Sequence, residues 1–210
     1  MLRSGWFALC GIIFFTPNAQ AATCSPTSFG VDTSYATGYD TPILGEAYGQ
    51  VFTASAPFLR SITVWRSNAG NVAGDALHLF LTRADSTGRP ESDSLVADGG
   101  TVTVPAVQGA PPTPFRFEFS PPLQLPGPGS YYFAVQGSPC GELINLLFAD
   151  TNPYPDGSVW RNHRTNTTTC HLAPGIESFP NSDFVFAVES CESDTPALAT
   201  SWGRVKSLYR

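Results

Sequence analysis

The segment Phe115-Arg116-Phe117-Glu118-Phe119 decides the fold class, because its apolar and charged residues alternate strictly. Successive side chains of a β-strand point to opposite faces of its sheet, so the three phenylalanines share one face and the two charged residues share the other. A helix would instead repeat its apolar residues every three or four positions. The segment therefore predicts a strand with one face in the core and one face in water.

The same two-residue period recurs along the rest of the chain. Every second residue of the segment 77–82 is leucine, and Phe80 lies on the other face, which predicts a strand that is covered on both faces. Alternation or β-rich composition predicts further strands at residues 49–53, 62–65, 95–98, 101–104, 131–136, 144–149, 158–161 and 183–189.

Turn-forming segments separate these strands at residues 67–70, 86–90, 99–100 and 126–129. Residues 105–114 are rich in Pro and Ala, and we expect them to cross from one sheet to another. The alternating helices that parallel βαβ units require are not indicated. We therefore expect an all-β fold, a single antiparallel β-sandwich of about nine or ten strands.

The first 21 residues have the pattern of a secretory signal peptide. Arg3 supplies the positive charge, residues 5–15 form a short apolar core, and Ala19-Gln20-Ala21 matches a cleavage site. The apolar run is too short to cross a bilayer as a helix. We therefore expect an exported protein, in the periplasm, at the cell surface or outside the cell, without a transmembrane span.

Cleavage after residue 21 would remove Cys10 and leave four cysteines in the mature chain. Cysteines of exported proteins usually form structural disulfides, and four of them allow three pairings. We expect Cys140–Cys170, which would close a loop of about 30 residues, and Cys24–Cys191, which would join the two ends of the domain. We therefore expect disulfides to cross-link the sandwich. The two alternative pairings of the four cysteines stay open.

The mature chain is acidic, with 10 Lys and Arg against 17 Asp and Glu. Binding to nucleic acid needs a basic surface, so we do not expect a nucleic-acid partner. The length suits one domain, which we place at residues 22–191. The oligomeric state is not indicated.

Residues 192–210 differ in character from the domain, since a polar spacer leads into a short basic segment. The segment has apolar residues at helical spacing but is too short to be a stable helix alone. It could order on a partner in the envelope or matrix, or it could be a frayed terminus. The residues expected to dock are Trp202, Arg204, Val205, Lys206 and Tyr209.

Several motifs resemble one family of modules. Gln50-Val51-Phe52-Thr53-Ala54 leads into residues 59–65, the Phe115–Phe119 segment precedes Tyr131-Tyr132-Phe133-Ala134-Val135, and residues 152–160 form a Pro- and Tyr-containing loop. Together, residues 48–190 resemble the jelly-roll modules of secreted bacterial proteins, which include carbohydrate-binding-like, galactose-binding-like and surface-anchored domains. The resemblance implies a jelly-roll-like topology and a role at the cell surface.

A sugar site needs flat aromatic rings beside planar polar groups, because the rings stack on C–H faces and the polar groups bind hydroxyls. The segment 152–163 offers the best local group of this kind. The alternative is that its aromatic residues only close the rim of the sandwich. The candidate ligand-binding residues are Tyr154, Asp156, Trp160, Arg161, Asn162 and His163.

The sequence also bears on metal binding and on catalysis. Asp150, Asn152 and Asp156 place oxygen ligands near one another, which suits a structural calcium ion, although such residues also cap turns. No other cofactor is expected. The sequence has no H-E-x-x-H or G-x-S-x-G motif, so no catalytic residues are assigned.

We interpret the chain as a secreted, non-catalytic binding module with glycans as the expected ligands. The alternative is a structural or assembly component of an envelope or matrix, docked through the C-terminal tail. A hydrolase with an unrecognised site is the third interpretation.

Deletion of residues 193–210 tests the docking role of the tail. We expect the truncated protein to be exported normally but to be retained less at the cell surface, since the docking residues are gone. Immunoblots of cell-surface and medium fractions measure this. Equal retention of the full-length and truncated proteins would show that the tail does not dock.

Overall fold

The computed structural model describes residues 26–41, 46–69, 74–106, 111–139, 143–163, 172 and 176–192. These residues belong to one compact unit, Cys24–Asp194. They form thirteen strands and one short 3-10 helix, η1 (Thr33–Tyr35), so the all-β class is confirmed. The predicted signal peptide, the docking residues of the tail and Cys24, Cys140 and Cys170 lie outside the described residues.

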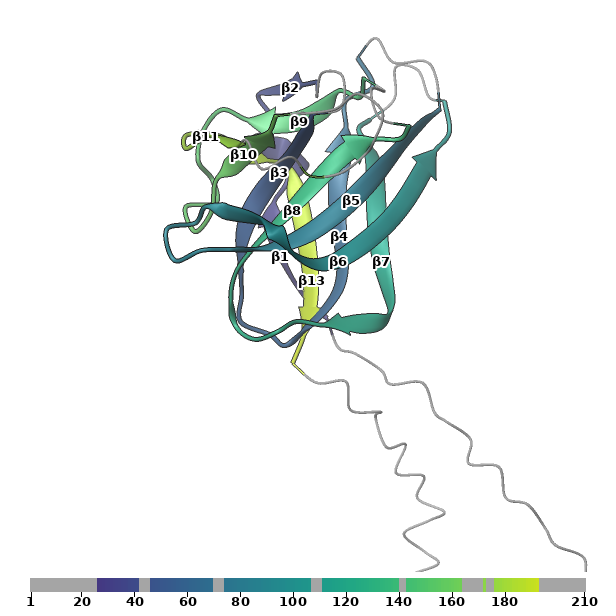
Figure 1. The fold of residues 1–210 in the computed structure, drawn as a ribbon. Helices are drawn as coiled ribbons and strands as arrows, with labels where there is room; N and C mark the ends of the chain where they lie inside the picture. Colours follow the sequence, from purple (N-terminus) through teal and green to yellow (C-terminus); the bar gives the residue numbers. More distant parts are fainter. Residues whose placement is uncertain are drawn as a thin grey trace, which may run out of the picture. The chain divides into compact units, whose positions relative to one another are not determined.

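The strands form two antiparallel sheets (Figure 1). The seven-stranded sheet contains β1 (Thr27–Val31), β2 (Gly38–Asp40), β4 (Phe58–Arg66), β7 (Thr113–Gln124), β9 (Leu146–Ala149), β12 (Asp183–Phe184) and β13 (Phe186–Cys191). The six-stranded sheet contains β3 (Ala47–Ala54), β5 (Asp75–Ala84), β6 (Pro90–Val104), β8 (Gly129–Gly137), β10 (Val159–Asn162) and β11 (Ile176–Phe179).

Eight of the strands pair in a nested way. The outermost pair is β1 with β13, followed inward by β3 with β8, β4 with β7 and β5 with β6. This is the pairing of a long hairpin that has been wound into two sheets, β1-β13-β4-β7 and β3-β8-β5-β6. It is the topology of a jelly roll, which confirms the expected architecture.

The remaining strands extend the two sheets at one end. β10 pairs with the free edge of β3 and β11 pairs with β10, so the six-stranded sheet grows beyond the jelly roll. In the other sheet, β9 pairs with β2 and β12. Figure 1 shows β2, β9, β10 and β11 gathered at the same end of the sandwich. This end is where the two sheets leave a pocket, described below.

The two-residue period explains which side chains form the core. Phe115 and Phe117 are buried, and Glu118 between the phenylalanines is exposed. The leucines of β5 lie in the same core, and Phe80 and Thr82 on its other face are also buried. The prediction that this strand is covered on both faces is therefore confirmed.

Two predictions about the strands were wrong. The strands are more numerous than nine or ten, because β1, β2 and β11 are short edge strands without a clear alternating pattern. Residues 99–100 are not a turn, since β6 runs through them without a break. Gly100 adopts a positive φ of 71°, and the register with β5 shifts there, so the two glycines form a bulge rather than a chain reversal.

β6 ends at Val104 and β7 begins at Thr113, and the two strands lie in different sheets, as the predicted crossing between sheets requires. Cys191 at the end of β13 is disulfide-bonded. The other three cysteines lie outside the described residues, so the two pairings stay predictions. Among the helices of the described chain, none is long and apolar enough to cross a membrane.

A buried polar bridge joins the two sheets near the pocket. Gln50 of β3 donates through Nε2 to Asp183 Oδ1 of β12 over 2.8 Å, and its Oε1 accepts from the Phe184 amide over 3.0 Å. The backbone amide of Tyr154 donates to Asp183 Oδ2 over 2.8 Å. Asp183 and Gln50 are both fully buried. Burial raises the pKa of Asp183 above its ordinary value, although the hydrogen bonds from Tyr154 and Gln50 oppose the rise.

The substitution Gln50→Leu tests this bridge. It removes the buried partner of Asp183 Oδ1 and of the Phe184 amide, whereas Asp183 Oδ2 keeps the Tyr154 amide. The two lost hydrogen bonds should lower the free energy of unfolding by about 3 kcal/mol at pH 7. Native Asp183 binds its proton more tightly than the unfolded chain does, so its contribution to stability falls as pH rises through its pKa. Protonation removes the unpaired charge, so the loss in the variant should shrink towards pH 4. Urea denaturation at both pH values measures this.

The matched control is Gln124→Leu, since Gln124 is an exposed glutamine at the end of β7. We expect it to change the free energy of unfolding by less than about 0.5 kcal/mol. A loss in the Gln50 variant that is equal at pH 7 and pH 4 would contradict the role given to the charge.

Candidate functional site

Strand β10 distributes the predicted ligand residues over the two faces of its sheet. Val159 belongs to the main core, and Arg161 lies on the same face because it is two residues further along the strand. Trp160 and Asn162 lie on the opposite face. Sequence neighbours that had been predicted to converge are therefore separated by the sheet itself.

Trp160 and Asn162 contact other strands of the six-stranded sheet that contains β10. Trp160 packs against the buried cluster that contains Tyr132, and its Nε1 donates to Ser158 Oγ over 2.9 Å. Asn162 is buried, and its Oδ1 accepts from the Tyr132 hydroxyl over 2.7 Å. Its Nδ2 donates to Ser92 Oγ over 3.1 Å. The contacts of both side chains are thus made within the protein.

Tyr154 and Asp156 lie on the loop between β9 and β10. The ring of Tyr154 packs edge-on against Phe186 at a centroid distance of 5.3 Å and contacts Phe29 at 6.3 Å. Its hydroxyl accepts from the Thr53 amide over 3.2 Å. Asp156 is exposed in a turn. The tyrosine ring therefore contributes to the core, in agreement with the rim-packing alternative.

Arg161 and His163 come together with two glutamates, and we call these four residues, Glu46, Arg161, His163 and Glu177, the charged cluster. Arg161 pairs with Glu177 and lies 3.8 Å from Glu46 Oε2. The two ring nitrogens of His163 lie 3.5 Å from Glu46 Oε1 and 3.3 Å from Glu177 Oε2. The cluster therefore holds one permanent positive charge against two carboxylates.

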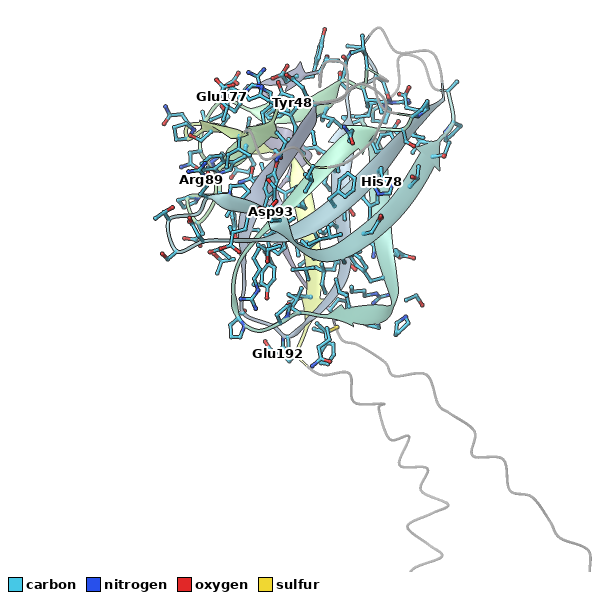
Figure 2. The ribbon with its side chains drawn as sticks, viewed as in Figure 1. Tyr48, His78, Arg89, Asp93, Glu177 and Glu192 are labelled. Carbon is cyan, nitrogen blue, oxygen red and sulfur yellow. The ribbon has the colours of Figure 1, made fainter. Side chains whose placement is uncertain are left out.

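The guanidinium of Arg161 also connects this cluster to aromatic residues. Its Cζ lies 5.9 Å from the ring centroid of Tyr48 and 5.6 Å from that of Phe179, within the range of cation–π attraction. Its Nη1 donates to the Tyr48 hydroxyl over 3.3 Å. Burial raises the pKa of Tyr48 above its ordinary value, although the hydrogen bond from Arg161 opposes the rise. Figure 2 shows Tyr48 and Glu177 near each other.

Tyr48 and Phe179 also line an opening between the two sheets, which we call the aromatic pocket. Its volume is about 200 Å³. Residues of β2, β3, β9 and β11 meet there, together with the residues that follow β9 and precede β12. The residues that line it are Gly38, Tyr39, Asp40, Tyr48, Phe148, Asp150, Phe179 and Ser182.

The aromatic residues of the pocket differ in exposure. Tyr48 and Phe148 are buried and meet edge-on at 6.1 Å, so they form a fixed floor. Phe179 is half-buried, and Tyr39 is 52% exposed. Phe148 is held from below by Phe184, at a centroid distance of 4.3 Å. The pocket therefore combines a rigid apolar floor with two rings that a ligand can reach.

Two exposed carboxylates complete the pocket. Asp150 Oδ2 accepts from the Thr37 hydroxyl over 3.0 Å, and Thr37 Oγ1 accepts in turn from the Asp150 amide over 2.8 Å. Asp40 Oδ1 accepts from the Thr41 amide over 2.7 Å. Each carboxylate is thus oriented through one oxygen. Within the described part of the chain, the other oxygen of each accepts no hydrogen bond.

A second opening, of about 440 Å³, lies between the start of β6 and the start of β11. It is larger than the aromatic pocket but has no aromatic residue in its lining. Apart from Ile176, its walls come from the single segment Arg89–Ser94. It offers no ring for stacking, so the aromatic pocket is the better candidate site.

Of the three candidate calcium ligands, Asp150 lines the aromatic pocket and Asp156 lies in a turn. The amide of Asn152, in the orientation that satisfies its neighbours, donates to Asp183 Oδ2 over 3.1 Å and to the Tyr154 carbonyl over 3.0 Å. In the residues that the structure describes, no three His, Cys, Asp or Glu side chains form a metal-binding group. Calcium binding stays a prediction.

The sequence patterns missed the residues of the aromatic pocket. Tyr39 lies in the stretch Ala-Thr-Gly-Tyr-Asp-Thr (36–41), where an aromatic residue stands among small and polar ones. An aromatic residue in such surroundings suggests an exposed ring, and this is the local signal that points to Tyr39 as a binding residue. Phe148 and Phe179 look like ordinary core residues in the sequence, because their place in a pocket depends on strands that are distant in the chain.

Comparisons with known proteins give little further guidance. No protein-family model and no curated protein matches the chain. Among solved structures, the cysteine protease and lectin-like domains of Cwp84, a surface layer associated protein of Clostridium difficile, match with 14% identity and a TM-score of 0.39 over 75% of this chain and 37% of that one. A structure of infectious bursal disease virus Gx strain matches with 13% identity and a TM-score of 0.30 over 95% and 51%. This similarity is too low to indicate a shared function.

Proposed function

We propose that the protein is a secreted, non-catalytic binding module that holds one sugar residue of a glycan in the aromatic pocket. The observation that carries the proposal is the presence of two reachable rings, Tyr39 and Phe179, beside the carboxylates of Asp40 and Asp150. The predicted signal peptide supports a location where glycans are exposed.

The size of the pocket favours a small ligand group. Pockets for drug-sized molecules measure roughly 300–1,000 Å³, and this one is smaller, at about 200 Å³. A single sugar ring at the end or side of a longer glycan suits this volume. The rest of the glycan would extend into solvent, since the pocket lies open at the surface.

The chemistry of the lining also suits a sugar. Tyr39 and Phe179 can stack on the C–H face of a sugar ring, as aromatic rings do with flat apolar surfaces. The unoccupied oxygens of Asp40 and Asp150 can accept hydrogen bonds from hydroxyl groups. The floor of Tyr48 and Phe148 is held by core contacts, so little ordering is needed on binding.

The substitution Tyr39→Ala tests the proposal. Removal of the exposed ring should weaken glycan binding at least tenfold without unfolding the protein, because the ring is half in water. The mature protein, residues 22–210, is first screened on a glycan array. Isothermal titration calorimetry then compares the protein and its variant with the best ligand.

The matched control is Tyr35→Ala, since Tyr35 is 54% exposed but does not line the pocket. It should bind as the unmodified protein does, and so should Trp160→Ala, whose ring packs on the opposite face of β10. Loss of binding in either control, or no glycan bound at all, would reject the aromatic pocket as a sugar site. Cleavage of the bound glycan would reject the non-catalytic role.

A further inference from the structure

We infer that the aromatic pocket selects a sugar that carries a positive charge, an amino sugar with a free amine, over neutral and anionic sugars. The inference rests on the proposed function, since it names the class of glycan that the same pocket would bind. It depends on the charges around the pocket and on the rings that an ammonium group would face.

The charges that line the pocket have one sign. Asp40 and Asp150 are its charged residues, and no Lys, Arg or His lines it within the described chain. Each carboxylate uses one oxygen on a neighbouring Thr and leaves the other free of hydrogen bonds to the described residues. An ammonium group has three donors and a charge, so it pairs with either carboxylate oxygen more strongly than a neutral hydroxyl does.

The nearest positive charge does not neutralise these carboxylates. Arg161 lies against the same two rings, Tyr48 and Phe179, that line the pocket. Its guanidinium is already paired with Glu177 and near Glu46, so the charged cluster adds no net positive charge. The field over the pocket therefore attracts a cation and repels the carboxylate or sulfate of an anionic sugar.

The rings of the pocket add to this preference. A cation over the face of a tyrosine or phenylalanine is attracted by the ring, and more strongly the further it is removed from water. Arg161 already makes this kind of contact on one side of Tyr48 and Phe179. An amino sugar in the pocket can therefore combine stacking, charge pairing and cation–π attraction. A neutral sugar has only the stacking and the hydrogen bonds from its hydroxyls to the carboxylates.

The test compares two tetrasaccharides that differ only in their amines, the β-1,4-linked tetramer of glucosamine and its fully N-acetylated form. Calorimetry with the mature protein at pH 6 and low salt should show binding of the amine form at least tenfold tighter. The double variant Asp40→Asn, Asp150→Asn lacks both pocket carboxylates. It should lose most of this preference, and its affinity for the acetylated tetramer should be unchanged. Higher salt should reduce the preference.

The matched control is Asp156→Asn, which removes one exposed carboxylate outside the pocket. The preference should survive this change. Equal affinity for both tetramers, or a preference that Asp156→Asn abolishes as fully as the pocket variant does, would overturn the inference and leave the sugar site intact. If no glycan binds, neutral or charged, both the proposed function and this inference are rejected.

Discussion

The buried carboxylate of Asp183 is the constraint on which the site end of the molecule depends. It lies in the short strand β12, accepts hydrogen bonds from Gln50 in the opposite sheet and from the Tyr154 amide, and has no access to water. Burying a charge without such partners is costly. Moving β12, Gln50 of β3 or the Tyr154 backbone out of position would therefore destabilise the fold. Through them, Asp183 sets the distance between the two sheets beside the pocket.

The pocket itself follows from the way the jelly roll is extended. β10 and β11 continue the six-stranded sheet beyond β3, and β2 and β9 continue the other sheet. Residues of β2, β3, β9 and β11 line the pocket. Tyr48 and Phe148 fill the deep part, and Tyr39 and Phe179 remain within reach of solvent.

Much of the fold could be predicted from local patterns, and the site could not. The alternation at Phe115–Phe119 and at the leucines of β5 predicted strands and their buried faces correctly, because a strand's two-residue period is a local property. Among the candidate ligand residues, the structure separates Trp160 from Arg161 by the same rule. Neighbouring residues of β10 lie on opposite faces of the sheet, so closeness in the sequence does not bring their side chains together.

The sequence by itself determined the all-β class, the burial of the main strands, the crossing between sheets and the acidic character, since each depends on residue types and near neighbours. Only the tertiary structure decided which residues meet at the pocket. Tyr39, Tyr48, Phe148 and Phe179 come from four strands spread over 141 residues of chain, numbered 39 to 179. Their meeting depends on strand pairing between distant segments and on buried polar bridges, and no local pattern encodes either one.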